Sequence, residues 1–207
     1  SLDGDADRLI VADENGRICD GDQILAALAL DMTERGVLQG AVVGTVMSNL
    51  GLERRLATAG IDFQRAAVGD RYIAERMRET GSQLGGEPSG HILLPALTRT
   101  GDGLIAALQI LSILARSGKK ASEILSSFTP VPQKLVNLRD MDKAVLEHPD
   151  VKTEMQAVRR ELVDEGRILL RPSGTEPVIR VMVEALDEAR LDAAMQRLVT
   201  ALKAAAQ

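Results

Sequence analysis

Hydrophobic residues in the first two thirds of the chain alternate between helix-like and strand-like spacing. Apolar residues that recur every three or four positions predict helices, and short apolar runs between them are typical of buried strands. The helical stretches cover residues 24–32, 52–59, 73–77 and 102–116, and the strand-like runs cover residues 41–46 and 61–66. Helices between such strands indicate βαβ units and a mainly parallel sheet.

Several residues mark where these helices begin and end. Gly36, Gly60 and Gly81 are placed to end helices, because glycine adopts the left-handed backbone conformation of a helix C-terminus without strain. Asp70 is placed to cap the helix that follows it, and Asp150 to cap a helix later in the chain.

The pattern changes after Pro130 and Pro132, which we interpret as a hinge. Beyond it, strands are expected at residues 135–138, 168–170 and 178–185, with helical faces at residues 151–162 and 191–202. The fold class predicted for the chain is α/β. A mixed, mainly parallel α/β/α sandwich domain precedes a smaller α+β domain of β-α-β-β-α order, in which a helix pair covers an antiparallel sheet.

Composition narrows the class of protein. Of the 207 residues, 45% are hydrophobic and 27% charged, as in globular proteins, and no apolar run approaches the roughly 18 residues of a membrane span. The net charge of −5 and an aromatic content of 1% argue against a nucleic-acid partner. The single cysteine, Cys19, cannot form an internal disulfide, and no signal peptide is visible, so we expect a cytoplasmic protein.

Three aspartates stand at alternate positions near the N-terminus: Asp3, Asp5 and Asp7. Their carboxylates repel one another unless a cation lies between them, and a hard divalent ion such as Mg²⁺ or Ca²⁺ prefers oxygen ligands. Arg8 would neutralise an anionic group that completes the metal's ligands. A solvated acidic turn is the alternative that needs no metal.

The same segment also matches part of an EF-hand Ca²⁺ loop. In this chain, the first, third, fifth, eighth and twelfth positions of such a loop would be occupied by Asp3, Asp5, Asp7, Ile10 and Glu14. Arg8 occupies the sixth position, where the EF-hand turn requires glycine, and this disfavours the EF-hand interpretation.

Residues 85–91 form a second polar loop, rich in glycine, that contains Glu87, Ser89 and His91. A carboxylate that accepts hydrogen bonds from two hydroxyls can hold a sugar, and glycines let the backbone approach the ring. Ser89 and His91 are weak candidates for a nucleophile and its base, since no orienting third group is near in the sequence. A hydrogen-bonded structural histidine beside a strand is equally compatible with this segment.

A third polar loop lies between two predicted strands and suits an anion. Arg171 offers planar, bidentate donors, and a turn at Gly174 can aim backbone N–H groups inward. Hydroxyls from Ser173 and Thr175 and a second charge from Arg180 complete a candidate phosphate site. A rigid turn between Pro172 and Pro177 is the interpretation without a ligand.

Taken in this order, the three loops resemble those of the α-D-phosphohexomutase family. The resemblance extends to Asp20-Gly21-Asp22-Gln23-Ile24-Leu25, Thr45-Val46-Met47-Ser48-Asn49-Leu50-Gly51, Val68-Gly69-Asp70-Arg71-Tyr72 and Thr100-Gly101-Asp102-Gly103, and so covers essentially the whole chain. Within the family, the chain is most similar to members that interconvert glucosamine 6-phosphate and glucosamine 1-phosphate, on the route to UDP-N-acetylglucosamine. The resemblance implies a phosphoserine and a bisphosphorylated sugar intermediate.

The resemblance also implies a role for individual residues. The Mg²⁺ ligands would be Asp3, Asp5 and Asp7. Glu87 and Ser89 would hold the sugar hydroxyls, and Arg8 and His91 would be the catalytic candidates. The substrate's phosphate would be bound by Arg171, Ser173, Gly174, Thr175 and Arg180.

Family members have four domains, so the resemblance divides the chain into three parts. Residues 1–19 would be the end of the second domain with the metal loop, residues 20–130 the sugar-binding third domain, and residues 131–207 the phosphate-binding fourth. The family's serine loop is absent from these 207 residues, so we expect the N-terminal half of the same protein as partner and no mutase activity without it. The oligomeric state stays open, a homodimer being one state compatible with the sequence.

One departure bears on the substrate. Pro88 stands where glutamine is usual in the enzymes that act on glucosamine phosphates. A phosphoglucomutase or phosphomannomutase specificity therefore stays open. A non-catalytic module that binds a phosphosugar or Ca²⁺ is a further, less favoured alternative.

Overall fold

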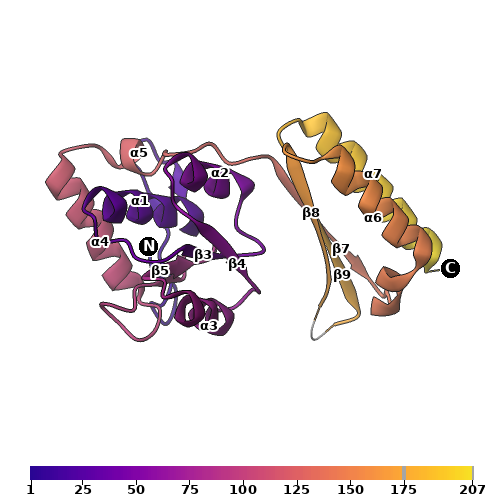
Figure 1. Ribbon diagram of the computed structural model, residues 1–207, viewed down its shortest axis with the longest axis horizontal. Helices are drawn as coiled ribbons and strands as arrows, with labels where there is room; N and C mark the ends of the chain where they lie inside the picture. The colour runs from indigo at the N-terminus through magenta and orange to yellow at the C-terminus, as the bar shows by residue number, and fades with distance from the viewer. Residues whose placement is uncertain (174–175, 207) are drawn as a thin grey trace. The chain divides into compact units, whose positions relative to one another are not determined.

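The computed structural model describes residues 1–173 and 176–206. The chain divides into two compact units, Ser1–Pro130 and Val131–Gln207. The division falls between the two prolines of the predicted hinge. Each unit has its own buried core. Figure 1 shows the helices and strands of both units. Across the described residues, no helix combines the length and the apolar character that crossing a lipid bilayer requires.

The first unit is built on a four-stranded sheet in the order β4-β3-β5-β6. Its strands are β3 (Val42–Thr45), β4 (Phe63–Ala66), β5 (Leu84–Gly86) and β6 (Ile92–Leu93). β3 pairs in parallel with β4 and β5, whereas β6 runs antiparallel to β5. The predicted mixed, mainly parallel sheet is therefore confirmed.

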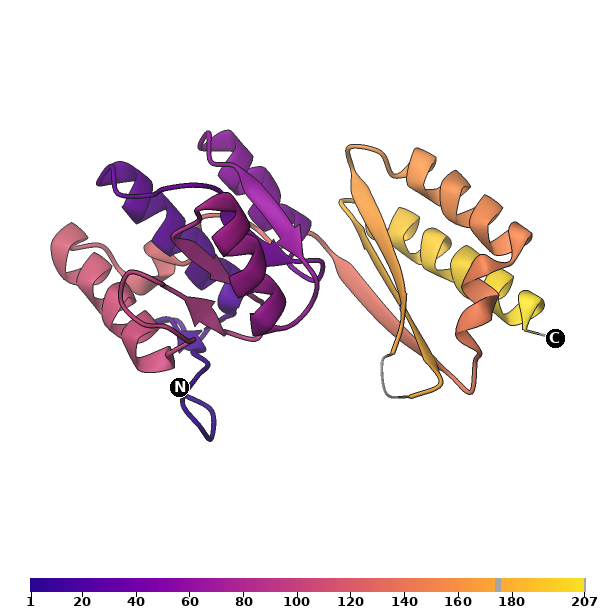
Figure 2. The same ribbon diagram turned by 60° about the horizontal axis from the view of Figure 1, so that its bottom comes forward.

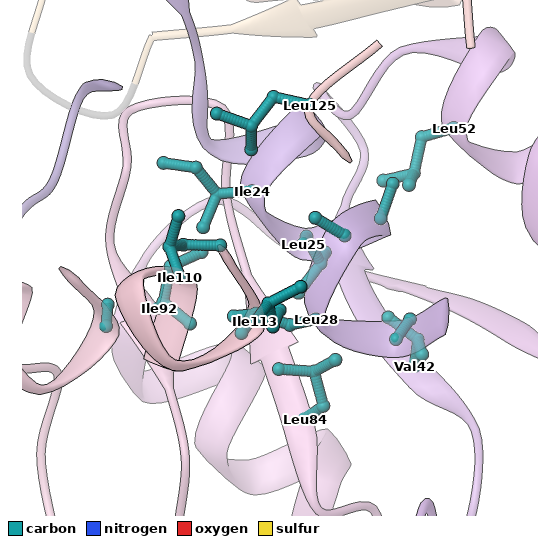
Figure 3. Packing of buried hydrophobic residues seen from close by; sticks show 14 of the residues in the cluster. Ile24, Leu25, Leu28, Val42, Leu52, Leu84, Ile92, Ile110, Ile113 and Leu125 are labelled. Atoms are coloured by element: carbon teal, nitrogen blue, oxygen red, sulfur yellow. The ribbon is translucent and has the colours of Figure 1, made fainter. Parts of the chain in front are cut away.

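Helices cover both faces of this sheet (Figure 1). α1 (Gly21–Glu34), α2 (Leu50–Thr58) and α4 (Gly103–Ser117) share one core with Val42 of β3, and α3 (Asp70–Thr80) shares another with Val43. Neighbouring residues of one strand thus point to opposite layers. In Figure 3 the side chains of α1 lie among residues of the sheet and of α4. The first nine residues of α1 are all buried, which makes it the central helix of the unit.

Two of the predicted helix caps are wrong. Asp70 is the first residue of α3, and the cap position belongs to Gly69, whose φ of 124° a side chain would strain. His148 caps α6 (Pro149–Glu161), and its Nδ1 accepts from the Asp150 backbone N–H. Proline is favoured as the first helical residue because it has no N–H to satisfy, which moves the cap back by two positions from Asp150.

Several short elements complete the first unit. β1 (Val11–Ala12) pairs with β2 (Ile18–Cys19), and α5 (Ala121–Ile124), which the apolar pattern did not predict, follows α4. A single backbone bridge pairs Arg8 with His91. The loop of the three aspartates is therefore held against the β5–β6 hairpin.

The second unit has the predicted β-α-β-β-α order, with one additional 3₁₀ helix, η1 (Lys143–Glu147). Its antiparallel sheet has the order β7-β9-β8, formed by β7 (Gln133–Arg139), β8 (Gly166–Pro172) and β9 (Val178–Ala185). α6 and α7 (Glu188–Ala205) lie side by side on one face of the sheet in both views (Figures 1 and 2). The apolar side of the central strand β9 faces this helix layer.

The other side of β9 is buried as well, which its alternating sequence did not predict. Met182 and Glu184 are 1% and 0% exposed. Because β9 lies between β7 and β8, residues of both neighbours flank them on the same face. Arg167, directly opposite on β8, forms an ion pair with the Glu184 carboxylate and so compensates its charge.

Candidate functional site

The three aspartates near the N-terminus form a compact group of oxygen donors. Asp3, Asp5 and Asp7 each offer one carboxylate oxygen, and these oxygens lie within 4.8 Å of one another. Ala6 has a left-handed φ of 62°, which is uncommon for a residue with a side chain and turns the loop on itself. One oxygen of Asp7, Oδ1, is buried and accepts no hydrogen bond from the described residues. An unsatisfied buried carboxylate oxygen among two other carboxylates fits a hard divalent cation.

Arg8 lies beside this group. Its backbone N–H donates to Asp3 Oδ1 over 3.2 Å, and its Nε lies 3.7 Å from Asp3 Oδ2 and 3.8 Å from Asp7 Oδ1. Desolvation is the largest single influence and acts to raise the pKa of Asp3, but the hydrogen bonds, led by that of the Arg8 backbone, together outweigh it and lower the pKa. Asp3 is therefore kept ionised, as a metal ligand must be.

The EF-hand interpretation is not supported by the position of Glu14. Its carboxylate accepts hydrogen bonds from the backbone and the hydroxyl of Ser122, at the start of the helix α5. Among the described residues, the group that could hold a metal contains the three aspartates and not Glu14.

The β5–β6 hairpin brings the residues of the second polar loop together. The Ser89 hydroxyl donates to Glu87 Oε1 over 2.9 Å, which fixes the carboxylate. Gly90, with a φ of 93°, donates its N–H to the Glu87 carbonyl and accepts at its own carbonyl from the Leu9 N–H. A side chain at Gly90 would overlap the Leu9 carbonyl. Glycine is therefore required both by its φ and by the close approach of the two backbone segments.

His91 connects this hairpin to the aspartate loop. It is 6% exposed, and its Nδ1 lies 3.1 Å from Asp7 Oδ2. Its Nε2 is buried without a hydrogen-bond partner among the described residues, and the ring packs against Gly101. The structure thus connects the loop of Asp7 and Arg8 to the hairpin that contains Glu87, Ser89 and His91.

The candidate phosphate residues lie in the second unit, at one end of its sheet. Arg171 of β8 and Arg180 of β9 are direct partners across the strands and therefore lie on the same face. Neither forms an ion pair with a carboxylate among the described residues. Desolvation, together with the nearby charge of Arg180, lowers the pKa of Arg171. Two adjacent cations without a counter-charge among the described residues suit an anion.

The loop that joins these strands is described in part. The Ser173 N–H donates to the Val178 carbonyl over 2.7 Å, and this bond continues the strand pairing beyond Pro172. Arg180 Nε is buried with no hydrogen-bond partner among the described residues. Gly174 and Thr175, the other two predicted phosphate ligands, lie outside the described residues.

Sequence reasoning gave no role to Asp22. This residue is 1% exposed at the start of α1, and burial raises its pKa to about 7. A signal was present, because only one of Asp20 and Asp22 can cap the helix, and the cap is Asp20. The carboxylate of Asp22 must therefore have a role other than capping the helix.

Comparisons with known proteins identify the family of this chain. Residues 20–131 match the family described as phosphoglucomutase/phosphomannomutase, alpha/beta/alpha domain III, and residues 135–201 match the C-terminal domain of the same family. The chain therefore belongs to the phosphoglucomutase/phosphomannomutase family.

Its relatives at about half identity are phosphoglucosamine mutases. That of Gluconacetobacter diazotrophicus is 50% identical over 206 residues, which are 99% of this chain and 46% of the relative. That of Granulibacter bethesdensis is 55% identical over 189 residues, 91% of this chain and 41% of the relative. The chain spans about half the length of the curated relatives it matches.

Solved structures give the same fold. The N-acetylphosphoglucosamine mutase of Aspergillus fumigatus, in complex with GlcNAc-6P and magnesium, aligns with a TM-score of 0.81 at 23% identity, over 100% of this chain and 48% of its own. A phosphoglucomutase/phosphomannomutase family protein from Burkholderia thailandensis aligns with a TM-score of 0.77 at 25% identity, over 99% of this chain and 46% of its own. The predicted α/β fold class is confirmed.

The contact between Gly90 and Leu9 gives a prediction about stability. Gly90→Ala is expected to lower the free energy of unfolding of the first unit by about 3 kcal/mol or more, because the cost of backbone strain is added to the cost of overlap with a carbonyl. Gly16→Ala is the control, because Gly16 also has a positive φ, of 80°, but open space around it. Its expected cost is about 1 kcal/mol, from strain alone. Urea unfolding measures both, and equal costs would contradict the close approach.

Proposed function

We propose that the chain is the C-terminal part of an enzyme that interconverts glucosamine 6-phosphate and glucosamine 1-phosphate. The observation that carries the proposal is the Asp7–His91 contact of 3.1 Å, which joins a group of metal-type ligands to a hairpin with a sugar-type carboxylate. The names of the relatives supply the substrate. The intact enzyme would act through a phosphoserine in its N-terminal half and a bisphosphorylated sugar.

Asp3, Asp5 and Asp7 fit Mg²⁺, which would neutralise charge that builds on a transferred phosphoryl group. Arg8 would place its guanidinium beside the same phosphoryl oxygens, since it already lies next to two of the aspartates. His91 would act through its Nδ1 contact with Asp7, because Nε2 is buried against Gly101 and closed to a substrate hydroxyl.

Glu87 and Ser89 would orient the sugar ring by hydrogen bonds to its hydroxyls. Arg171, Arg180 and Ser173, with Gly174 and Thr175, would bind the phosphate that is not being transferred. The uncompensated charge of the two arginines supports this assignment. Residues 1–19 would close the preceding domain, followed by the sugar-binding domain at 20–130 and the phosphate-binding domain at 131–207. The lone, buried Cys19 supports a cytoplasmic location.

The decisive experiment is a mutase assay on the full-length protein that carries these 207 residues. We expect turnover of glucosamine 1-phosphate to glucosamine 6-phosphate, in preference to glucose and mannose phosphates in competition. A preference for glucose or mannose phosphate would instead assign phosphoglucomutase or phosphomannomutase specificity, which Pro88 leaves open. The 207-residue polypeptide alone is expected to show no turnover, because it contains no serine loop. Turnover by that polypeptide would refute the proposed phosphoserine mechanism.

The metal assignment predicts which carboxylate matters. Asp5→Asn is expected to weaken Mg²⁺ binding at least about tenfold, because it removes one of three charged ligands. Glu14→Gln is the matched control and should bind Mg²⁺ as the unmodified chain does, since Glu14 bonds to Ser122. Isothermal titration calorimetry measures both. A loss of affinity in Glu14→Gln as well as in Asp5→Asn would favour an EF-hand, which uses both positions, and full affinity in Asp5→Asn would remove Asp5 from the metal site.

The phosphate site gives a separate prediction. Arg180→Gln is expected to weaken binding of glucosamine 6-phosphate at least about tenfold, because a charged, forked donor is lost. Arg197→Gln is the control, since Arg197 lies on α7 and pairs with Glu154 and Glu161. Titration of each variant of the full-length protein with the sugar phosphate gives the affinities. Equal affinities in the two variants would remove Arg180 from the site.

A further inference from the structure

The beginning of α1 is packed directly against the β5–β6 hairpin. The Gly21 N–H donates to the Pro88 carbonyl over 3.0 Å. A side chain at Gly21 would overlap the Glu87 carbonyl and lie too close to the Gly90 nitrogen. The backbone between Glu87 and Gly90 therefore rests on the first helical residue of α1, and any shift of that residue is transmitted to it.

On its other side, the same helix turn is attached to the loop of residues 45–49. Asp22 Oδ2 accepts from the Asn49 backbone N–H over 2.7 Å, and the Ser48 hydroxyl also hydrogen-bonds to the carboxyl. This loop follows β3, at the carboxyl end of the parallel strands. Consecutive residues of one turn, Gly21 and Asp22, thus touch two separate loops.

The loop of residues 45–49 is rigid because each of its backbone N–H groups has an acceptor. Those acceptors are the Ser48 hydroxyl, the Ala66 carbonyl, the Thr45 hydroxyl, the Thr45 carbonyl and the Asp22 carboxylate, in chain order. Arg65, at the end of β4, donates to the Thr45 and Ser48 carbonyls and pairs with Glu53 of α2. Asp22 supplies the last of these acceptors, and it belongs to α1.

Hydrogen bonding to Asn49 does not by itself require a carboxylate, because an asparagine oxygen would accept the same bond. Asp22 instead keeps an ionisable group in the core, with Oδ1 buried and without a partner among the described residues. A buried, partly satisfied charged group costs stability and is characteristic of functional sites.

We propose that Asp22 is a positioning residue, which fixes the first turn of α1, and with it the hairpin of Glu87 and Ser89, against the loop of residues 45–49. It touches no substrate in this assignment and acts through Gly21 and Pro88. The effect on turnover rests on the proposed function, whereas the effect on the two loops does not.

The charge of Asp22 makes this arrangement depend on pH. Burial raises its pKa to about 7, and the charge of Asp20 adds to the increase, while the Asn49 N–H, Ser48 and Arg65 act to lower it. The protonated carboxyl is the form that burial favours, so its stabilising contribution is complete below about pH 3.8 and is lost as the pH rises through about 7. Ionisation places a charge in the core, and the free-energy cost of burying that charge destabilises the turn. The hairpin should therefore be held less firmly at alkaline pH.

The kinetic test compares the full-length enzyme with Asp22→Asn, which keeps the acceptor but cannot ionise. The ratio of the unmodified KM for glucosamine 1-phosphate to that of Asp22→Asn is expected to rise at least about threefold between roughly pH 6 and pH 8.5. Titration of the substrate's own phosphate cancels in this ratio. Asp31→Asn is the control, since Asp31 pairs with Arg35 and Arg116 at the far end of α1, and its ratio should stay flat. A flat ratio for Asp22→Asn would overturn the proposal.

Amide hydrogen exchange on the 207-residue chain tests the same connection without any assay of turnover. In Asp22→Ala, exchange at Asn49 and Gly21 is expected to be at least about tenfold faster, and in Asp22→Asn close to that of the unmodified chain. Unchanged exchange at Gly21 in Asp22→Ala would overturn the positioning role even if the full-length enzyme were an active mutase. Conversely, an inactive full-length protein with the expected exchange pattern would refute the proposed function and leave the role of Asp22 intact.

Discussion

The close approach of three backbone segments around Gly21 and Gly90 is the constraint on which the first unit's candidate site depends. The aspartate loop, the β5–β6 hairpin and the start of α1 meet there through hydrogen bonds between main-chain groups. Main-chain contacts at this distance leave no room for a side chain at either glycine. The side chains of Asp7, Glu87 and His91 are then fixed relative to one another because their backbones cannot move independently.

The two units gather side chains of opposite charge. The first gathers carboxylates around one arginine, with a buried histidine that links them to a hydroxyl-bearing hairpin. The second places Arg171 and Arg180 side by side on a sheet, where each raises the electrostatic cost of the other. A substrate that is both a polyol and a phosphate ester contains groups complementary to each unit. This complementarity is the physical basis of the proposed sugar-phosphate function.

The sequence predicted the elements well wherever apolar spacing was long and regular. α1, α4, β3 and β9 lie where their periodicity places them, because burial of one face dominates local preference in such segments. It failed at helix starts and short elements. Asp70 and Asp150 are not caps, and η1 and α5 had no signal, since a few residues without periodicity are decided by neighbours distant in the sequence.

The sequence by itself determined the chemistry available: three alternate carboxylates, a glycine-rich loop with Glu87, and an arginine turn, because these depend on residue type and short spacing. Only the tertiary structure decided that His91 lies against Asp7, eighty-four positions away, and that Asp22 is buried with its pKa raised to about 7. Contacts over such separations follow from how α1 and the sheet pack. Packing is a property of the whole unit, so no local pattern of residues encodes it.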